Sequence, residues 1–154
     1  MKDHQYKTNI TWTGNTGKGT ETYRGYERSH TVSTEGKPDI LMSSDPAFSG
    51  DRGKYNPEDL LLISLSSCHM LWYLHLCADA GIVVTDYTDD ASGTMTEDNE
   101  GGRFTEVILH PQVKITDAAQ KEKALALHVE AHKKCFIANS CNFPVRHEAV
   151  CDVK

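Results

Sequence analysis

Residues 60–78 read LLLISLSSCHMLWYLHLCA and contain no Asp, Glu, Lys or Arg. The residues just before them are typical of a helix start, because Asn56 is a good N-cap and Pro57 suits the first helical position. Glu58 and Asp59 would then lie in the first turn, where the helix dipole favours carboxylates. Gly81 is the stop signal expected after such a helix. The sequence therefore predicts one long apolar helix.

A helix of this length and composition could also cross a membrane. Three serines and two histidines interrupt the apolar run, however, and no basic cluster flanks it. A helix buried in a globular protein fits this pattern better, and so apolar a segment is expected to be covered in part by a second subunit. We therefore predict a homodimer that does not associate with a membrane.

Strands are predicted on both sides of the long helix. Residues 5–32 combine turn signals with aromatic and β-branched residues at alternate positions, which indicates an opening β-meander. Residues 82–98 and 103–116 are separated by a turn cluster and predict a hairpin.

A second helix is predicted over residues 118–135, capped by Asp117, and a last strand is predicted around residues 145–153. The chain shows no βαβ alternation, no repeat and no linker long enough to separate domains. This order of elements predicts a single α+β domain over residues 1–154 with an antiparallel sheet.

Composition excludes some classes of function. The formal net charge of -6 and the scattered basic residues argue against nucleic-acid binding. The charged N-terminus is unlike a secretory signal, so we expect a cytoplasmic protein. The odd number of cysteines and the lack of a CxxC motif favour free or catalytic thiols. These cysteines are Cys68, Cys77, Cys135, Cys141 and Cys151.

Taken alone, Cys68 in the middle of the apolar helix and Cys135 at the end of the second helix are ordinary core residues. They could meet only through the fold, which sequence spacing does not reveal. A competing hypothesis is a metal-binding module, for which His132 and Cys135 have ligand-like spacing on one helical face. The other ligands of that module would be Cys68, His69 and His75.

Two motifs together resemble the OsmC/Ohr family of hydroperoxide reductases. The first is NPEDLLLISLSSC at residues 56–68, and the second is CFIANSCNFPV at residues 135–145. The turn WTGNTGKGT at residues 12–20 and the loop SSDPAF at residues 43–48 are also similar. The resemblance therefore extends over nearly the whole chain.

The resemblance implies an intertwined homodimer in which an antiparallel sheet wraps around a long buried central helix. Its active sites would lie at the subunit interface and reduce hydroperoxides, typically organic ones, in defence against oxidative stress. No cofactor is implied, only an external dithiol reductant. Cys68 corresponds to the peroxidatic cysteine, Cys135 to the resolving cysteine, and Glu58 to the glutamate that partners an arginine near the reactive sulfur.

The arginine itself is not identified by the motifs. Arg24, Arg28 and Arg52 are candidates, and we prefer Arg28 because it falls on the predicted second strand. A cation is needed because an unperturbed thiol, with a pKa of about 8.5, is mostly protonated at neutral pH. The helix dipole cannot replace it, because Cys68 lies some three turns from the helix start. Trp72 is a candidate for binding the alkyl part of the peroxide.

Glu58 and Cys68 are ten residues apart, which a straight helix would convert into roughly 15 Å. Either the helix breaks between them, or the two residues of one site come from different subunits. Cys141 is an alternative resolving thiol. A further hypothesis keeps the fold but assigns it to a ligand-binding or stress protein with little peroxidase activity.

Overall fold

The computed structural model describes residues 2–154 and confirms an α+β fold. The chain divides into two compact units, residues 1–60 and residues 61–154, which are described separately here. The expectation of a single domain over residues 1–154 stays a prediction.

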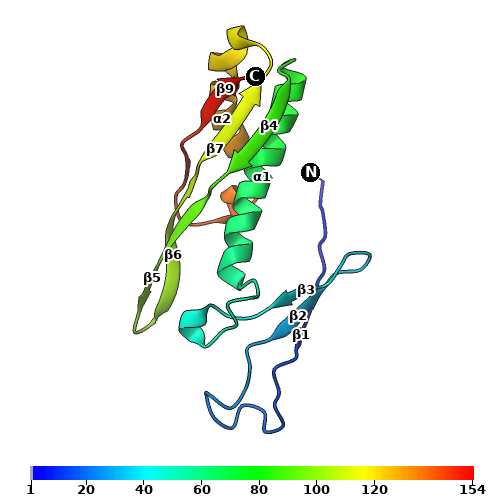
Figure 1. Cartoon of the computed structure of the whole chain (residues 1–154), viewed down its shortest axis with the longest axis vertical. Helices are drawn as coiled ribbons and strands as arrows, with labels where there is room; N and C mark the ends of the chain where they lie inside the picture. The colour runs from blue at the N-terminus through cyan, green and yellow to red at the C-terminus, as the bar shows by residue number, and fades with distance from the viewer. Residues whose placement is uncertain (1) are drawn as a thin grey trace. The chain divides into compact units, whose positions relative to one another are not determined.

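The N-terminal unit contains the predicted β-meander. Its three strands pair antiparallel in the order β1-β2-β3 (Figure 1). The strands are shorter than expected, and a long loop of residues 13–29 joins the first two. The elements are β1 (Asn9–Trp12), β2 (His30–Ser33), β3 (Ile40–Met42) and a short 3-10 turn η1 (Pro46–Phe48).

Helix α1 (Pro57–Asp79) begins and ends where the sequence predicts. At its start the Asp59 N–H donates to Asn56 Oδ1 over 2.8 Å, and the Asn56 N–H donates to Asp59 Oδ2 over 3.1 Å. This reciprocal pair is a capping box, which satisfies two backbone donors that the first turn would leave unpaired. At its end Gly81 adopts a left-handed φ of 72°, which glycine tolerates without strain.

The C-terminal unit adds two three-stranded sheets, with orders β4-β7-β9 and β5-β6-β8. The β5–β6 hairpin, which turns at residues 99–100, confirms the predicted turn cluster and extends away from the helices in Figure 1. The strands are β4 (Val84–Asp89), β5 (Ser92–Asp98), β6 (Gly101–Leu109), β7 (Pro111–Ile115), β8 (Val145–His147) and β9 (Val150–Val153).

The prediction of a purely antiparallel sheet was wrong for the end of the chain. The predicted last strand is two strands, of which β8 pairs parallel with β6 and β9 pairs parallel with β7. Helix α2 (Lys121–Lys134) supplies the connection that parallel pairing requires, since it returns the chain to the starting end of the sheet. The 3-10 turns η2 (Ala118–Gln120) and η3 (Ala138–Ser140) flank this helix.

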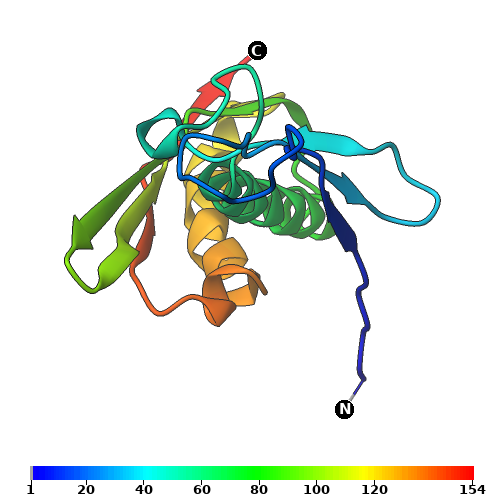
Figure 2. The same cartoon turned by 90° about the horizontal axis from the view of Figure 1, so that it is seen from below.

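Both helices lie on one face of the β4-β7-β9 sheet (Figures 1 and 2). Strand β7 alternates buried and exposed residues, so Val113 and Ile115 face the helices. They pack with Tyr73 and Cys77 of α1. The face that α1 turns toward α2 and this sheet therefore forms one of two hydrophobic clusters in the unit, and the other contains Leu65, Val107, Leu109 and Val145.

Much of α1 is nevertheless uncovered within the chain. The helix is long and apolar enough to cross a membrane by length and composition, a property that it shares with core helices of soluble proteins. Only 22% of the most apolar stretch of this helix is buried, and the side chains of Ile63 and Leu71 are exposed. A large apolar surface of α1 thus remains open in the single chain.

Candidate active site

Cys68 lies on α1 beside the buried stripe of that helix. The stripe consists of Leu65, His69, Tyr73 and Cys77, which recur every four residues. Cys68 is one position away from this stripe and is only partly buried. Its sulfur is thus held by a rigid helix but is not sealed in the core.

Cys135 is the first residue beyond α2. Its N–H donates to the His132 carbonyl over 3.2 Å, and its backbone then becomes extended. The side chain is 1% exposed, and Cys135 Sγ accepts a hydrogen bond from the Ala138 N–H over 3.4 Å. The turn after α2 therefore fixes this sulfur in the interior.

The fold brings Cys68 and Cys135 together. Burial raises the pKa of Cys135 to about 11, and a hydrogen bond with the Cys68 thiol raises it as well. Burial is the larger of these two causes, so the thiol of Cys135 keeps its proton at neutral pH. Both thiols are free. Two neighbouring thiols, of which one is partly exposed and the other is buried, form an asymmetric dithiol.

Glu58 cannot belong to this dithiol through its own helix. Helix α1 is unbroken from Pro57 to Asp79, so the first of the two alternatives, a break between Glu58 and Cys68, is wrong. Ten residues of straight helix separate the two side chains by roughly 15 Å along the axis. Only a Glu58 from a second subunit remains compatible with a shared site.

The preferred arginine, Arg28, lies in the loop before β2 and not on the predicted strand. Its guanidinium donates to the carbonyls of Tyr26 and Tyr23, each over 2.6 Å. The same group lies 4.1 Å from the ring centre of Tyr26 and 4.3 Å from that of Tyr23. The prediction that Arg28 lies on a strand was therefore wrong, and two carbonyls and two rings of its own loop hold the side chain.

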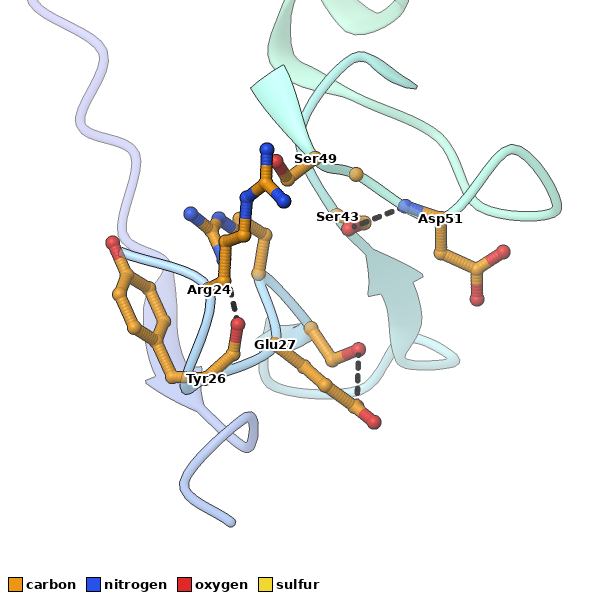
Figure 3. Close-up of a pocket in the computed structure, with 9 residues that line it drawn as sticks. Arg24, Tyr26, Glu27, Ser43, Ser49 and Asp51 are labelled. Atoms are coloured by element: carbon orange, nitrogen blue, oxygen red, sulfur yellow. Dashed lines mark hydrogen bonds between the residues drawn. The ribbon is translucent and has the colours of Figure 1, made fainter. Parts of the chain in front are cut away.

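Arg24 and Arg28 both line an open pocket of about 430 Å³ in the N-terminal unit (Figure 3). Its floor includes Ser43, whose hydroxyl accepts the Asp51 N–H over 3.0 Å. Neither arginine forms an ion pair with a carboxylate within residues 2–154. Arg52, the third candidate, lies in an exposed turn and does not line this pocket.

Comparison with known proteins identifies the family. Residues 49–149 match the family model described as OsmC-like protein. The chain belongs to the OsmC-like family. A structure from Vibrio cholerae, described as an OsmC-like protein of unknown function, is 30% identical, with a TM-score of 0.84 over 96% of this chain and 100% of that chain.

Two further relatives are more distant. An organic hydroperoxide resistance protein from Elizabethkingia anophelis shares the fold at 20% identity, with a TM-score of 0.70 over 99% of this chain and 100% of that one. An uncharacterized protein from Methanocaldococcus jannaschii is 29% identical over 101 residues, or 63% of this chain and 50% of that protein. The matched region thus spans about half the length of this curated relative.

This OsmC-like chain also has an apolar hollow close to the thiols. Leu71, Trp72 and His75 line a space of about 210 Å³, and they recur with Cys68 at the spacing of one helical face. The ring of Phe136, the residue after Cys135, meets Trp72 edge to face at 5.6 Å. Trp72 is therefore placed where an alkyl group could approach the dithiol.

The metal-binding hypothesis finds no support in the geometry. Within residues 2–154 no three His, Cys, Asp or Glu side chains converge closely enough to hold an ion. His75 instead pairs with Asp79 over 3.3 Å on the exposed side of α1.

Sequence reasoning missed a cluster of four histidine rings in the C-terminal unit. His69 and His128 occupy fully buried positions on the two helices, where the spacing predicts apolar residues. His147 and His132 lie next to them. The signal that could have found the cluster is a histidine on each buried helical stripe, since such histidines need a partner.

Proposed function

We propose that this OsmC-like protein is a thiol-dependent peroxidase that reduces organic hydroperoxides, with hydrogen peroxide as a poorer substrate, in defence against oxidative stress. The observation that carries the proposal is the contact between a partly exposed Cys68 and a buried, protonated Cys135. A thiol pair with one accessible and one protected member suits a peroxidatic and a resolving cysteine.

The cycle begins when the Cys68 thiolate attacks one oxygen of the peroxide. An S–O bond forms, the O–O bond breaks, and the other oxygen leaves as an alcohol after it takes a proton. Cys68 is thereby oxidised to a sulfenic acid, and the peroxide is reduced. Cys135 then attacks Cys68 Sγ, so that the S–S bond forms and water leaves. An external dithiol reopens the disulfide by thiol exchange.

We assign the activating cation to Arg28, supplied together with Glu58 of the partner subunit in a homodimer. Arg28 is immobilised by its tyrosine contacts and has no carboxylate partner within residues 2–154, so it is free to bind one. A carboxylate would hold the guanidinium fork in a fixed orientation toward the sulfur. The uncovered apolar surface of α1 supports a second subunit packed against this helix.

The uncovered hollow at Trp72 suits the alkyl group of an organic peroxide. We place the protein in the cytoplasm, where free thiols are kept reduced and dithiol reductants are available. In this proposal the chain needs no cofactor and binds neither nucleic acid nor a membrane.

A stoichiometric assay tests this function. Purified protein is mixed with cumene hydroperoxide or hydrogen peroxide and a dithiol reductant, and peroxide loss is measured for the wild type and for Cys68→Ser. We expect turnover by the wild type, faster with the organic peroxide, and none by Cys68→Ser. Trp72→Leu should slow the reaction with cumene hydroperoxide and leave that with hydrogen peroxide unchanged. A wild type without Cys68-dependent turnover would favour an OsmC-like ligand-binding or stress protein.

A further inference from the structure

Four histidine rings from three elements form one connected group in the C-terminal unit. His69 lies on α1, His128 and His132 lie on α2, and His147 lies on β8. The ring centre of His147 is 5.4 Å from that of His69, 5.9 Å from that of His128 and 6.1 Å from that of His132. Each gap is short enough for a direct contact or a single bridging water.

His69 and His128 share a proton within the ring plane. His69 Nε2 and His128 Nδ1 are 3.0 Å apart, the ring planes lie within 8° of parallel, and the ring centres are 5.3 Å apart. This geometry joins two ring edges and does not stack two faces. Tyr73 stacks on the face of His128 at 3.8 Å and keeps that ring in place.

The outer nitrogens of this pair, His69 Nδ1 and His128 Nε2, are buried without a partner in the described chain. When both rings are neutral, each carries one proton, and the direction of the hydrogen bond decides which nitrogens hold the two protons. If His69 donates from Nε2, the proton of His128 is on its Nε2. If His128 donates from Nδ1, the proton of His69 is on its Nδ1. Moving the shared proton therefore takes up a proton at one end and releases one at the other. A buried pair with open ends is suited to pass protons on.

A dithiol that closes to a disulfide needs a group that accepts a proton. Cys135 holds its proton, since burial and Cys68 raise its pKa to about 11, so almost none of it is thiolate at neutral pH. Cys135 must lose this proton to attack Cys68. His132 lies one turn before Cys135 on α2, and its carbonyl accepts the Cys135 N–H. It is the member of the cluster nearest to Cys135 along the chain.

We propose that the four histidines form a proton-transfer chain for the Cys68–Cys135 pair, in which His132 takes the proton of Cys135 and His147 connects it to the buried His69–His128 pair. This inference deepens the proposed function, because it concerns the disulfide-forming step of the same site. In that step the Cys135 proton moves to His132, the S–S bond forms as the S–O bond of the sulfenic acid breaks, and the leaving oxygen receives a proton from the chain as water. No net proton is gained or lost.

The surroundings of the two buried rings keep them neutral, so that each ring has one donor nitrogen and one acceptor nitrogen. Burial lowers the pKa of His69 to about 4 and that of His128 to about 3, and the neighbouring histidines lower both further. The aromatic groups that face the cluster are Tyr73 from α1, which stacks on His128, and Tyr87 from β4, which lies beyond Tyr73. No carboxylate changes the pKa of His69, His128 or His147.

The test separates the two thiols without a peroxide. In a Cys141→Ala background, dithiobis(nitrobenzoate) is attacked by Cys68, which releases one coloured thiolate and leaves a mixed disulfide. Cys135 then displaces the second coloured thiolate as the protein disulfide forms. Stopped-flow absorbance resolves both releases in the wild-type background, in His132→Gln and in His147→Gln. His110→Gln, in which a histidine outside the cluster is changed, is the matched control.

We expect His132→Gln to slow the second release about 100-fold at pH 7 and to leave the first release unchanged. His147→Gln should slow the second release by a smaller factor than His132→Gln does. In His132→Gln the second rate should rise tenfold for each pH unit, because only pre-ionised Cys135 reacts, and imidazole added to the buffer should restore it. His110→Gln should behave as the background protein does.

Equal second rates in His132→Gln, His147→Gln and His110→Gln would overturn the proton chain. That result leaves the peroxidase proposal intact, since the assay contains no peroxide. Conversely, a protein that shows the histidine dependence but consumes no peroxide would refute the peroxidase and support the chain. The unchanged first release reports in the same trace that each variant is folded.

Discussion

Helix α1 carries two cysteines, each near a second thiol, and only one of these pairs is built for chemistry. Cys68 is partly exposed and contacts Cys135, whereas Cys77 is 1% exposed and lies near Cys151 in the apolar core. Burial raises the pKa of Cys77 and also that of Cys151. Each pair joins one thiol of α1 to one thiol outside it, so access to one sulfur is what separates the two pairs.

The largest expected effect comes from removing the second thiol of each pair. Cys135→Ser should consume one equivalent of peroxide and then stop, because the Cys68 sulfenic acid has no partner thiol. Cys151→Ala should turn over as the wild type does. Peroxide loss and intact mass after one equivalent of cumene hydroperoxide measure both outcomes.

A mass increase of one oxygen on Cys135→Ser, confined to Cys68, is the expected signature. The comparison of the two pairs fails if Cys151→Ala loses turnover while it remains folded. It fails equally if Cys135→Ser continues to turn over, and Cys141 would then be the thiol to remove next.

A second test uses the two buried histidines, His69 of α1 and His128 of α2. Folding lowers the pKa of His69 from 6.5 to about 4 and that of His128 to about 3, chiefly through burial. The folded state thus favours neutral rings. The contribution of these lowered pKa values to the free energy of unfolding is fully present above pH 6.5 and is lost as pH falls from 6.5 toward 4. For His69 alone it is on the order of 3 kcal/mol.

Urea unfolding monitored by circular dichroism between pH 7.5 and 4 measures this loss. His128→Gln should flatten the pH dependence, although it lowers stability at pH 7.5 because the stacking and the hydrogen bond with His69 change. His110→Gln should keep the wild-type slope. An equal slope in His128→Gln and His110→Gln would show that the buried pair does not control acid stability.

The limits of both helices and the position of the hairpin turn could be predicted from the sequence, because their signals are local. The capping box at Asn56, the glycine after α1 and the cap at Asp117 act within a few residues, and they place both helices correctly. The hairpin turn is equally local. These elements in turn place Cys68 in the middle of α1 and Cys135 directly after α2.

The rest depends on contacts between distant residues. Parallel pairing of β8 and β9 joins residues far apart in the chain, so alternation of side chains cannot reveal it. The meeting of Cys68 with Cys135 and of His69 with His128 has the same origin. Arg28 is held by its own loop, which the alternating pattern around it wrongly predicted to be a strand.

The smallest expected effect is a difference in alkylation rate within the reactive pair itself. Iodoacetamide reacts with thiolates, and burial, together with the neighbouring Cys68, raises the pKa of Cys135 to about 11. Native protein at pH 8 should therefore be modified at Cys68 at least about tenfold faster than at Cys135, as measured by peptide mass spectrometry. Cys77 and Cys151 should stay unmodified until denaturant is added, because their side chains are buried.

In Cys68→Ser a hydroxyl replaces the neighbouring thiol, yet Cys135 remains buried and should still react slowly. Fast labelling of Cys135 in that variant would mean that the neighbouring sulfur, and not burial, protects it, and the order of the two causes would be reversed.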